Sequence, residues 1–128
     1  MKYSRRGVIT FGALSLLCAC SRRGYSVVVT VQPSAIDVVL EIVRSFAAQH
    51  HYQPEEVVNP GPNDLYYRGR WSFFSFYAQE NMTEDSFVAE FRHQPEILLP
   101  RDDLETWLKE FVGATRQVEG VFVPEGCE

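Results

Sequence analysis

Basic residues are scarce in this sequence, and Lys2 and Lys109 are its only lysines. The 128 residues include 12 Lys or Arg against 17 Asp or Glu, a formal net charge of −5 with a pI near 5.2. Proteins that bind nucleic acid draw most of their affinity from clustered Lys and Arg. The acidic balance therefore excludes nucleic acid as the main partner.

Motifs for common catalytic or metal sites are also missing. The sequence has no G-x-S-x-G elbow, no glycine-rich phosphate loop, no H-E-x-x-H and no C-x-x-C. Its three histidines are His50, His51 and His93. The adjacent pair would point about 100° apart on a helix and cannot chelate a metal as an i, i+4 pair does. We therefore expect no enzyme, no metal site and no cofactor.

Low complexity and long apolar runs are equally scarce. With 7 Pro, 8 Gly, 45% hydrophobic and 23% charged residues, the composition is that of one folded domain. Only residues 8–17 form an apolar run, after a basic start that contains Arg5 and Arg6. This run is about half of the ~20 residues that a membrane-spanning helix needs. The pattern is typical of an export signal that is removed.

The end of this leader reads Leu17-Cys18-Ala19-Cys20 and resembles the lipobox of bacterial lipoproteins. The resemblance implies that residues 1–19 are a cleaved signal peptide. It also implies that Cys20 becomes the N-terminus and carries a diacylglycerol thioether, usually with a third acyl chain on its amine. Two or three chains give stable anchoring in a membrane. The resemblance covers only the leader, and Cys18 replaces the usual Ala or Ser, so cleavage by the ordinary signal peptidase is the alternative.

Two further features of the leader concern its route. Residues 4–9, Ser-Arg-Arg-Gly-Val-Ile, resemble the twin-arginine export signal, although Val8 and Ile9 replace its favoured Phe and Leu. A plain basic start is the alternative. Ser21, not Asp, follows Cys20, which in lipoproteins of two-membrane bacteria favours transfer to the outer membrane. The resemblance thus implies a lipid-anchored protein of the cell envelope, on the outer membrane and facing the periplasm.

Processing would leave a distinctly acidic domain on a short tether. Loss of residues 1–19 removes three basic and no acidic residues, so nine basic face seventeen acidic ones and the net charge is −8. The processed chain would contain two cysteines, the acylated Cys20 and Cys127. Because only Cys127 would have a free thiol, no internal disulfide can form. The tether, residues 20–24, spans at most ~14 Å. We therefore expect the domain to lie close to the membrane, with Arg22 and Arg23 near anionic head groups.

The remaining residues, 25–128, are predicted to form a single α+β domain. The pattern indicates a strand at 25–31, a helix opened by a capping box of Ser34 and Asp37, a loop at 54–63, strands at 70–79 and 86–93, a helix at 100–112 and a strand at 118–123. Asp102 with Glu105 is expected to cap the second helix, and Gly113 to end it. This order predicts a ferredoxin-like β-α-β-β-α-β sandwich, an antiparallel sheet with two helices on one face. Residues 65–67 remain a candidate for an edge strand, and residues 97–99 for a short extra strand or a packed loop.

The strand at 70–79 carries aromatic side chains at both alternating positions. Helices can cover only one face of such a sheet, which leaves aromatic surface on the other. We predict Phe74 and Phe76 in the core, and Trp71, Phe73 and Tyr77 as contacts for a protein partner or a second copy of the chain. A bulge, a register shift or cover by the proline-rich loop is the alternative.

These features favour a non-catalytic envelope lipoprotein whose small domain binds a protein close to the membrane. It would serve as an accessory subunit or as an immunity-like inhibitor of a toxin. A net charge of −8 suits a basic partner, because complementary fields speed association. The alternative is a small-molecule or glycan-binding module, and an enzyme is the third class.

Overall fold

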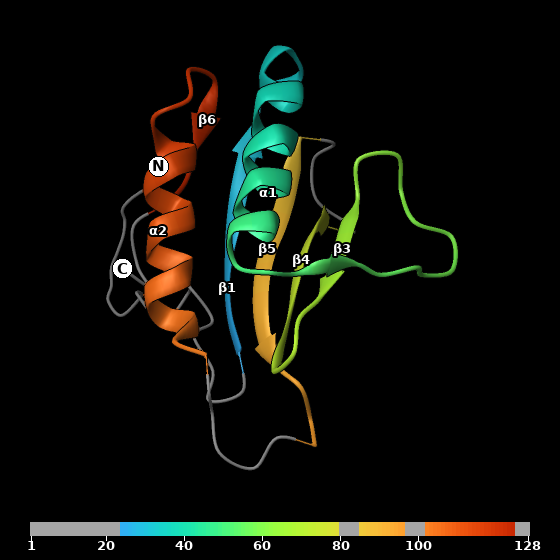
Figure 1. Cartoon of the computed structure of the whole chain (residues 1–128). Coiled ribbons are helices and arrows are strands. Elements are labelled where there is room, and N and C mark those ends of the chain that lie inside the picture. Colours follow the sequence, from blue (N-terminus) through green and yellow to red (C-terminus); the bar gives the residue numbers. More distant parts are fainter. Residues whose placement is uncertain (1–23, 80–84, 97–101, 125–128) are drawn as a thin grey trace.

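The computed structural model describes residues 24–79, 85–96 and 102–124. These residues form one antiparallel six-stranded sheet and two α-helices (Figure 1). The strand order is β2-β3-β4-β5-β1-β6. The strands are β1 Gly24–Val31, β2 Gln53–Pro54, β3 Leu65–Arg68, β4 Ser72–Ala78, β5 Ser86–His93 and β6 Val121–Phe122, and the α-helices are α1 Ile36–Gln49 and α2 Leu104–Arg116. The predicted α+β class is therefore confirmed.

Several predicted residues lie outside the described part of the chain. They are residues 1–19 of the predicted signal peptide, the lipidation candidate Cys20, residues 97–99 and Cys127.

Helix α1 has the predicted apolar stripe but not the predicted cap. Its buried side chains are Val39, Leu40, Val43, Phe46 and Ala47. The capping box of Ser34 and Asp37 is wrong, because Pro33 starts a 3₁₀ turn, Pro33–Ala35, that contains Ser34. The N-cap of α1 is Ala35, which makes no side-chain cap hydrogen bond.

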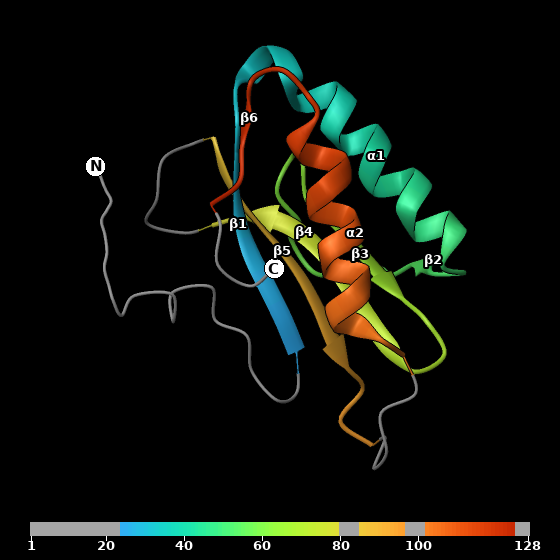
Figure 2. The same ribbon diagram turned by 90° about the vertical axis from the view of Figure 1, so that its left-hand side faces the viewer.

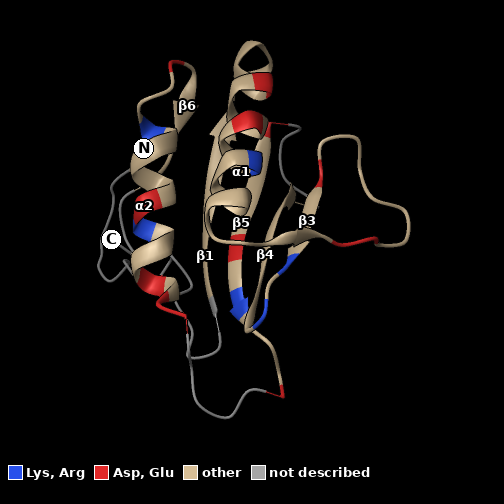
Figure 3. Ribbon diagram, in the orientation of Figure 1, with Lys and Arg blue, Asp and Glu red and all other residues tan. Residues whose placement is uncertain are grey.

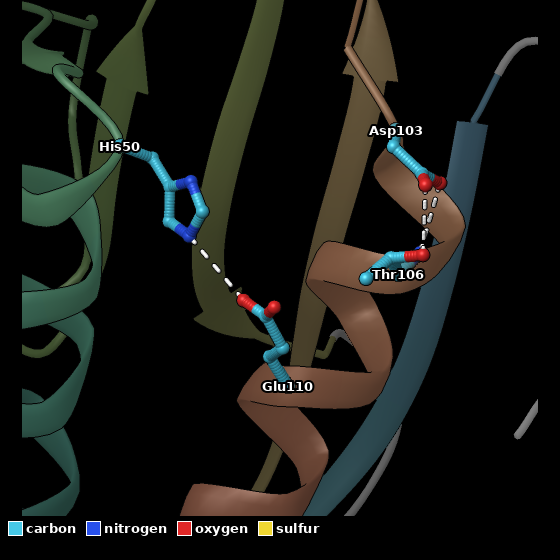
Figure 4. A network of polar contacts seen from close by, with 4 residues as sticks. All are labelled: His50, Asp103, Thr106 and Glu110. Carbon is cyan, nitrogen blue, oxygen red and sulfur yellow. Dashed lines mark hydrogen bonds and ion pairs between the residues drawn. The ribbon is translucent and has the colours of Figure 1, made fainter.

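Helix α2 begins and ends later than predicted. Asp103, not Asp102, is the N-cap, and its carboxylate accepts hydrogen bonds from the backbone N and the Oγ1 of Thr106, at 3.2 and 2.8 Å (Figure 4). The helix runs through Gly113 to Arg116, because Thr115 is buried and continues the apolar stripe. Asp102 is left free for another contact, described below.

The sheet is wider on one side, and shorter at its last strand, than predicted. β3 confirms the candidate edge strand at 65–67, and β2 pairs with β3 as the outermost strand of the sheet. The last strand is only Val121–Phe122 and not residues 118–123. The backbone N of Val118 instead donates to the carbonyl of Thr115 in the turn after α2.

Both helices pack on the same face of the sheet (Figure 2). The ring centroid of Phe74 in β4 lies 5.7 Å from that of Phe46 in α1 and 5.6 Å from that of Phe111 in α2. Phe74 also stacks on Phe91 of β5 at 4.5 Å. Phe74 and Phe76 have no exposed surface, which confirms that they belong to the core.

Candidate functional site

The sheet face opposite the helices is the first candidate site, and we call it the open face. Strand alternation assigns to it side chains that are half-buried or exposed, apart from Ser86 at the start of β5, which is buried. They are Ser26, Val28 and Thr30 of β1, Tyr66 and Arg68 of β3, Phe73, Ser75 and Tyr77 of β4, Val88, Glu90 and Arg92 of β5, and Phe122 of β6. No helix of the described structure covers this face (Figure 2).

Phe73 lies between two arginines on the open face. Arg68 and Arg92 are its register partners on β3 and β5, and their guanidinium carbons lie 5.0 and 5.1 Å from the ring centroid. These are cation–π contacts, which stabilise an arginine over an aromatic face. Arg68 also forms an ion pair with Glu55, with an N–O distance of 3.5 Å. The open face therefore holds an ordered Arg-Phe-Arg row.

Tyr77 stacks on Tyr66 toward the other end of β4. The ring centroids are 6.0 Å apart and the ring planes differ by 13°. The hydroxyl of Tyr66 donates to Asp64 at 3.4 Å. Burial raises the pKa of Tyr77, and the nearby carboxylate of Glu90 raises it further. The hydroxyl of Tyr77 therefore stays protonated and can donate a hydrogen bond. The two rings present apolar surface with polar tips, a combination common at protein interfaces.

Trp71 lies just before β4, in the turn that follows β3. It is half-buried, and the guanidinium carbon of Arg70 lies 4.8 Å from its ring centroid. Its carbonyl accepts a hydrogen bond from the backbone N of Gln94 at 3.0 Å. Phe73 and Tyr77 thus share the open face, whereas Trp71 borders it. Sequence reasoning missed Arg68, Arg70 and Arg92, although arginines flanking an aromatic strand were a visible signal.

A buried polar cluster at the start of β4 is the second candidate. Ser72 has no exposed surface, and its Oγ donates to Oδ2 of Asp102 at 2.6 Å. The Tyr52 hydroxyl lies 2.6 Å from the same Oγ, and it donates because the single Ser72 proton already goes to Asp102. Burial strongly raises the pKa of Tyr52. His93, opposite Ser72 in the register, is buried, and its Nδ1 has no hydrogen-bond partner among the residues that the structure describes.

This cluster joins the fold together rather than offering a reactive centre. A nucleophile must reach a substrate, and the fully buried Ser72 is already held by a carboxylate and a phenol. Its bonds connect β4 to Tyr52, in the segment between α1 and β2, and to Asp102, just before α2. We therefore interpret it as structural.

His50 lies at the end of α1, between two aromatic rings. Its ring centroid is 4.4 Å from that of Phe46 and 4.2 Å from that of Trp107. Burial lowers the pKa of His50, and the carboxylate of Glu110, 3.6 Å from Nε2, opposes this effect (Figure 4). The neutral ring accordingly packs as an aromatic side chain between the two helices.

In residues 24–79, 85–96 and 102–124 no group of three or more His, Cys, Asp or Glu could hold a metal ion. No helix in these same ranges has the length and apolar character to cross a membrane. Comparisons of the chain with protein-family models, curated proteins and solved structures found no match.

Proposed function

We propose that the chain is a lipid-anchored envelope protein whose non-catalytic domain binds a protein partner at the open face, close to the membrane. The observation that carries this proposal is the half-exposed aromatic surface of Phe73, Tyr77 and Tyr66, on the face that the helices leave uncovered. Aromatic side chains dominate the energetics of many protein interfaces. The partner would be an envelope subunit or a toxin, or the contact would join two copies of the chain.

The fold assignment proposed with this function is the ferredoxin-like sandwich. The antiparallel order β4-β5-β1-β6, together with α1 after β1 and α2 after β5, supports it. Strands β2 and β3 would then be an extension at the β4 edge. This extension adds Tyr66 and Arg68 to the open face.

The anchor is proposed at Cys20, with the protein on the outer membrane and facing the periplasm. Leu17-Cys18-Ala19-Cys20 supports it, and β1 starts at Gly24, so the domain follows almost directly. The test is incorporation of labelled palmitate into the full chain. We expect Cys20→Ala to lose the label and the matched control Cys127→Ala to keep it. A wild-type chain without label, or a Cys20→Ala chain with undiminished label, would contradict the anchor.

The proposed protein contact at the open face is tested by a photo-crosslinking residue placed at position 77, in place of Tyr77, in the full chain. The matched control replaces Glu41, which is exposed on α1 in the helix layer. We expect one defined protein adduct from position 77 and none from position 41. An adduct of twice the mass of the chain would identify self-association. Equal crosslinking at both positions, or none at 77, would contradict the proposal.

A further inference from the structure

One end of the open face gathers arginines around two aromatic rings. A single row across the sheet runs from Gly24 to Arg92, then Phe73, then Arg68. Arg70 and Trp71 lie in the turn beside this row. We call Arg68, Arg70, Trp71, Phe73 and Arg92 the arginine corner. All three of its arginines are exposed.

The arginine corner is also the end of the sheet nearest the proposed anchor. Gly24 begins β1, and the four steps back to Cys20 span at most ~14 Å. Neighbouring strands are about 4.8 Å apart, so Arg92 is one spacing from Gly24 and Arg68 is three. An acylated Cys20 would therefore keep all three arginines within reach of lipid head groups.

Charge distinguishes this corner from the rest of the domain. Three of the six basic residues in the described ranges belong to it, whereas these ranges contain thirteen acidic residues. Figure 3 shows blue segments at the ends of β3 and β5, and both red and blue segments on the two helices. Glu55 pairs with Arg68, and Glu96, Asp102 and Asp103 lie at the same end of the molecule, in the loop after β5 and at the start of α2. A negative surface would attract the arginine corner and repel most of the remaining domain.

The side chains of the corner suit a membrane interface. Arginines bind phosphate groups through their planar array of donors. Tryptophan is enriched at the level of the head groups, because its ring is apolar and its N–H is polar. The Arg70–Trp71 and Arg68–Phe73–Arg92 contacts supply both elements in one place.

We propose that the arginine corner rests on the head groups of anionic phospholipids and orients the domain on the membrane. This inference rests on the proposed anchor at Cys20, and it divides the open face between a lipid contact and a protein contact. Tyr77 is about 13 Å along β4 from Phe73, so the Tyr66–Tyr77 stack stands away from the lipid and remains open to the protein partner. Trp71 and Phe73 then contact lipid and not the protein partner, and the protein contact on the open face narrows to Tyr66 and Tyr77.

The two tryptophans of the chain provide the test. The full acylated chain is reconstituted in vesicles that contain brominated phospholipids, which quench nearby tryptophan fluorescence. Trp107→Phe leaves Trp71 as the reporter, and Trp71→Phe leaves Trp107, which lies in α2. The vesicles are made of phosphatidylcholine alone or of phosphatidylcholine with phosphatidylglycerol. Circular dichroism checks that each variant is folded.

We expect at least a twofold loss of Trp71 fluorescence in the anionic vesicles, and little loss from Trp107. Replacing Arg70 and Arg92 with Ser should reduce the Trp71 quenching at least twofold, as should high salt, whereas the matched Arg44→Ser change on α1 should not. Equal quenching of Trp71 in both vesicle types overturns the inference, as does equal quenching of the two tryptophans. A protein crosslink from position 70, in place of lipid contact, also overturns it. Failure of the anchor is read separately, as a chain without acyl mass that does not stay with the vesicles.

Discussion

Phe73 and Phe74 are neighbours in β4 but occupy opposite faces of the sheet, so the same substitution should have unequal consequences. Phe74 has no exposed surface and contacts Phe46, Phe91 and Phe111 within 4.5–5.7 Å of its ring centroid. Truncation of a buried Phe to Ala typically costs about 3–5 kcal/mol. This is a large part of the about 5–15 kcal/mol by which a domain is stable. Phe74→Ala should therefore abolish folding or nearly so.

Phe73→Ala should instead cost about 1–2 kcal/mol, because it removes two exposed cation–π contacts of about 0.5–1 kcal/mol each. The assay is the denaturant midpoint of both variants. Phe74→Leu is added because it keeps an apolar side chain, and it should cost about 1–3 kcal/mol. If Phe73→Ala proved as destabilising as Phe74→Ala, the open face would be buried and the proposed contact surface would not exist. A Phe74→Ala cost below about 1 kcal/mol would contradict the register of β4.

Three further predictions concern the residues around the two helices. Burial lowers the pKa of His50, so the unfolded state binds its proton first, and the free energy of unfolding should fall as pH drops below about 6.5. Glu110→Gln removes the carboxylate that raises this pKa, and should steepen the fall in denaturant midpoints between about pH 7.5 and about pH 5.5. Ser72→Ala should cost about 1–3 kcal/mol of unfolding free energy by leaving buried polar partners unpaired, whereas Ser75→Ala on the open face should be near neutral; equal costs would contradict the cluster. Asp103→Ala should lower the thermal midpoint by removing the cap of α2, while Asp103→Asn keeps most of it, and an unchanged midpoint in the Ala variant would argue against this cap.

Periodicity made the apolar faces of the elements predictable from sequence. The stripe of α1 and the burial of Phe74 and Phe76 follow from the repeat of the helix and the alternation of the strand. These patterns depend on spacing alone. They hold even where the ends of the elements are misplaced.

Helix caps were less predictable, because a cap depends on the backbone angles of one residue. Ser34 and Asp102 both have the right chemistry. Ser34 lies inside the 3₁₀ turn that Pro33 starts, and so it does not cap α1. Asp102 accepts a hydrogen bond from Ser72, and Asp103 occupies the N-cap position of α2. A shift of one residue leaves the hydrophobic pattern unchanged, so the sequence offered no means to choose.

The arginine corner and the Ser72 cluster depend on contacts between distant segments. Ser72 and Asp102 are 30 positions apart, and Arg68 and Arg92 come together on the Phe73 ring only through the register of three strands. Strand register is set by the whole sheet and by its turns. The sequence could indicate aromatic surface on β4 and arginines near its start, but not that Arg68 and Arg92 would lie on either side of the Phe73 ring.

The intact mass of the chain extracted from membranes shows whether the proposed anchor exists. We propose that an acylated N-terminal cysteine holds this domain at the membrane with its open face available to a partner. We therefore predict a chain that begins at Cys20 and carries the added mass of a diacylglycerol and one further acyl chain. An unmodified chain that begins at Cys20 or at any other residue would contradict it.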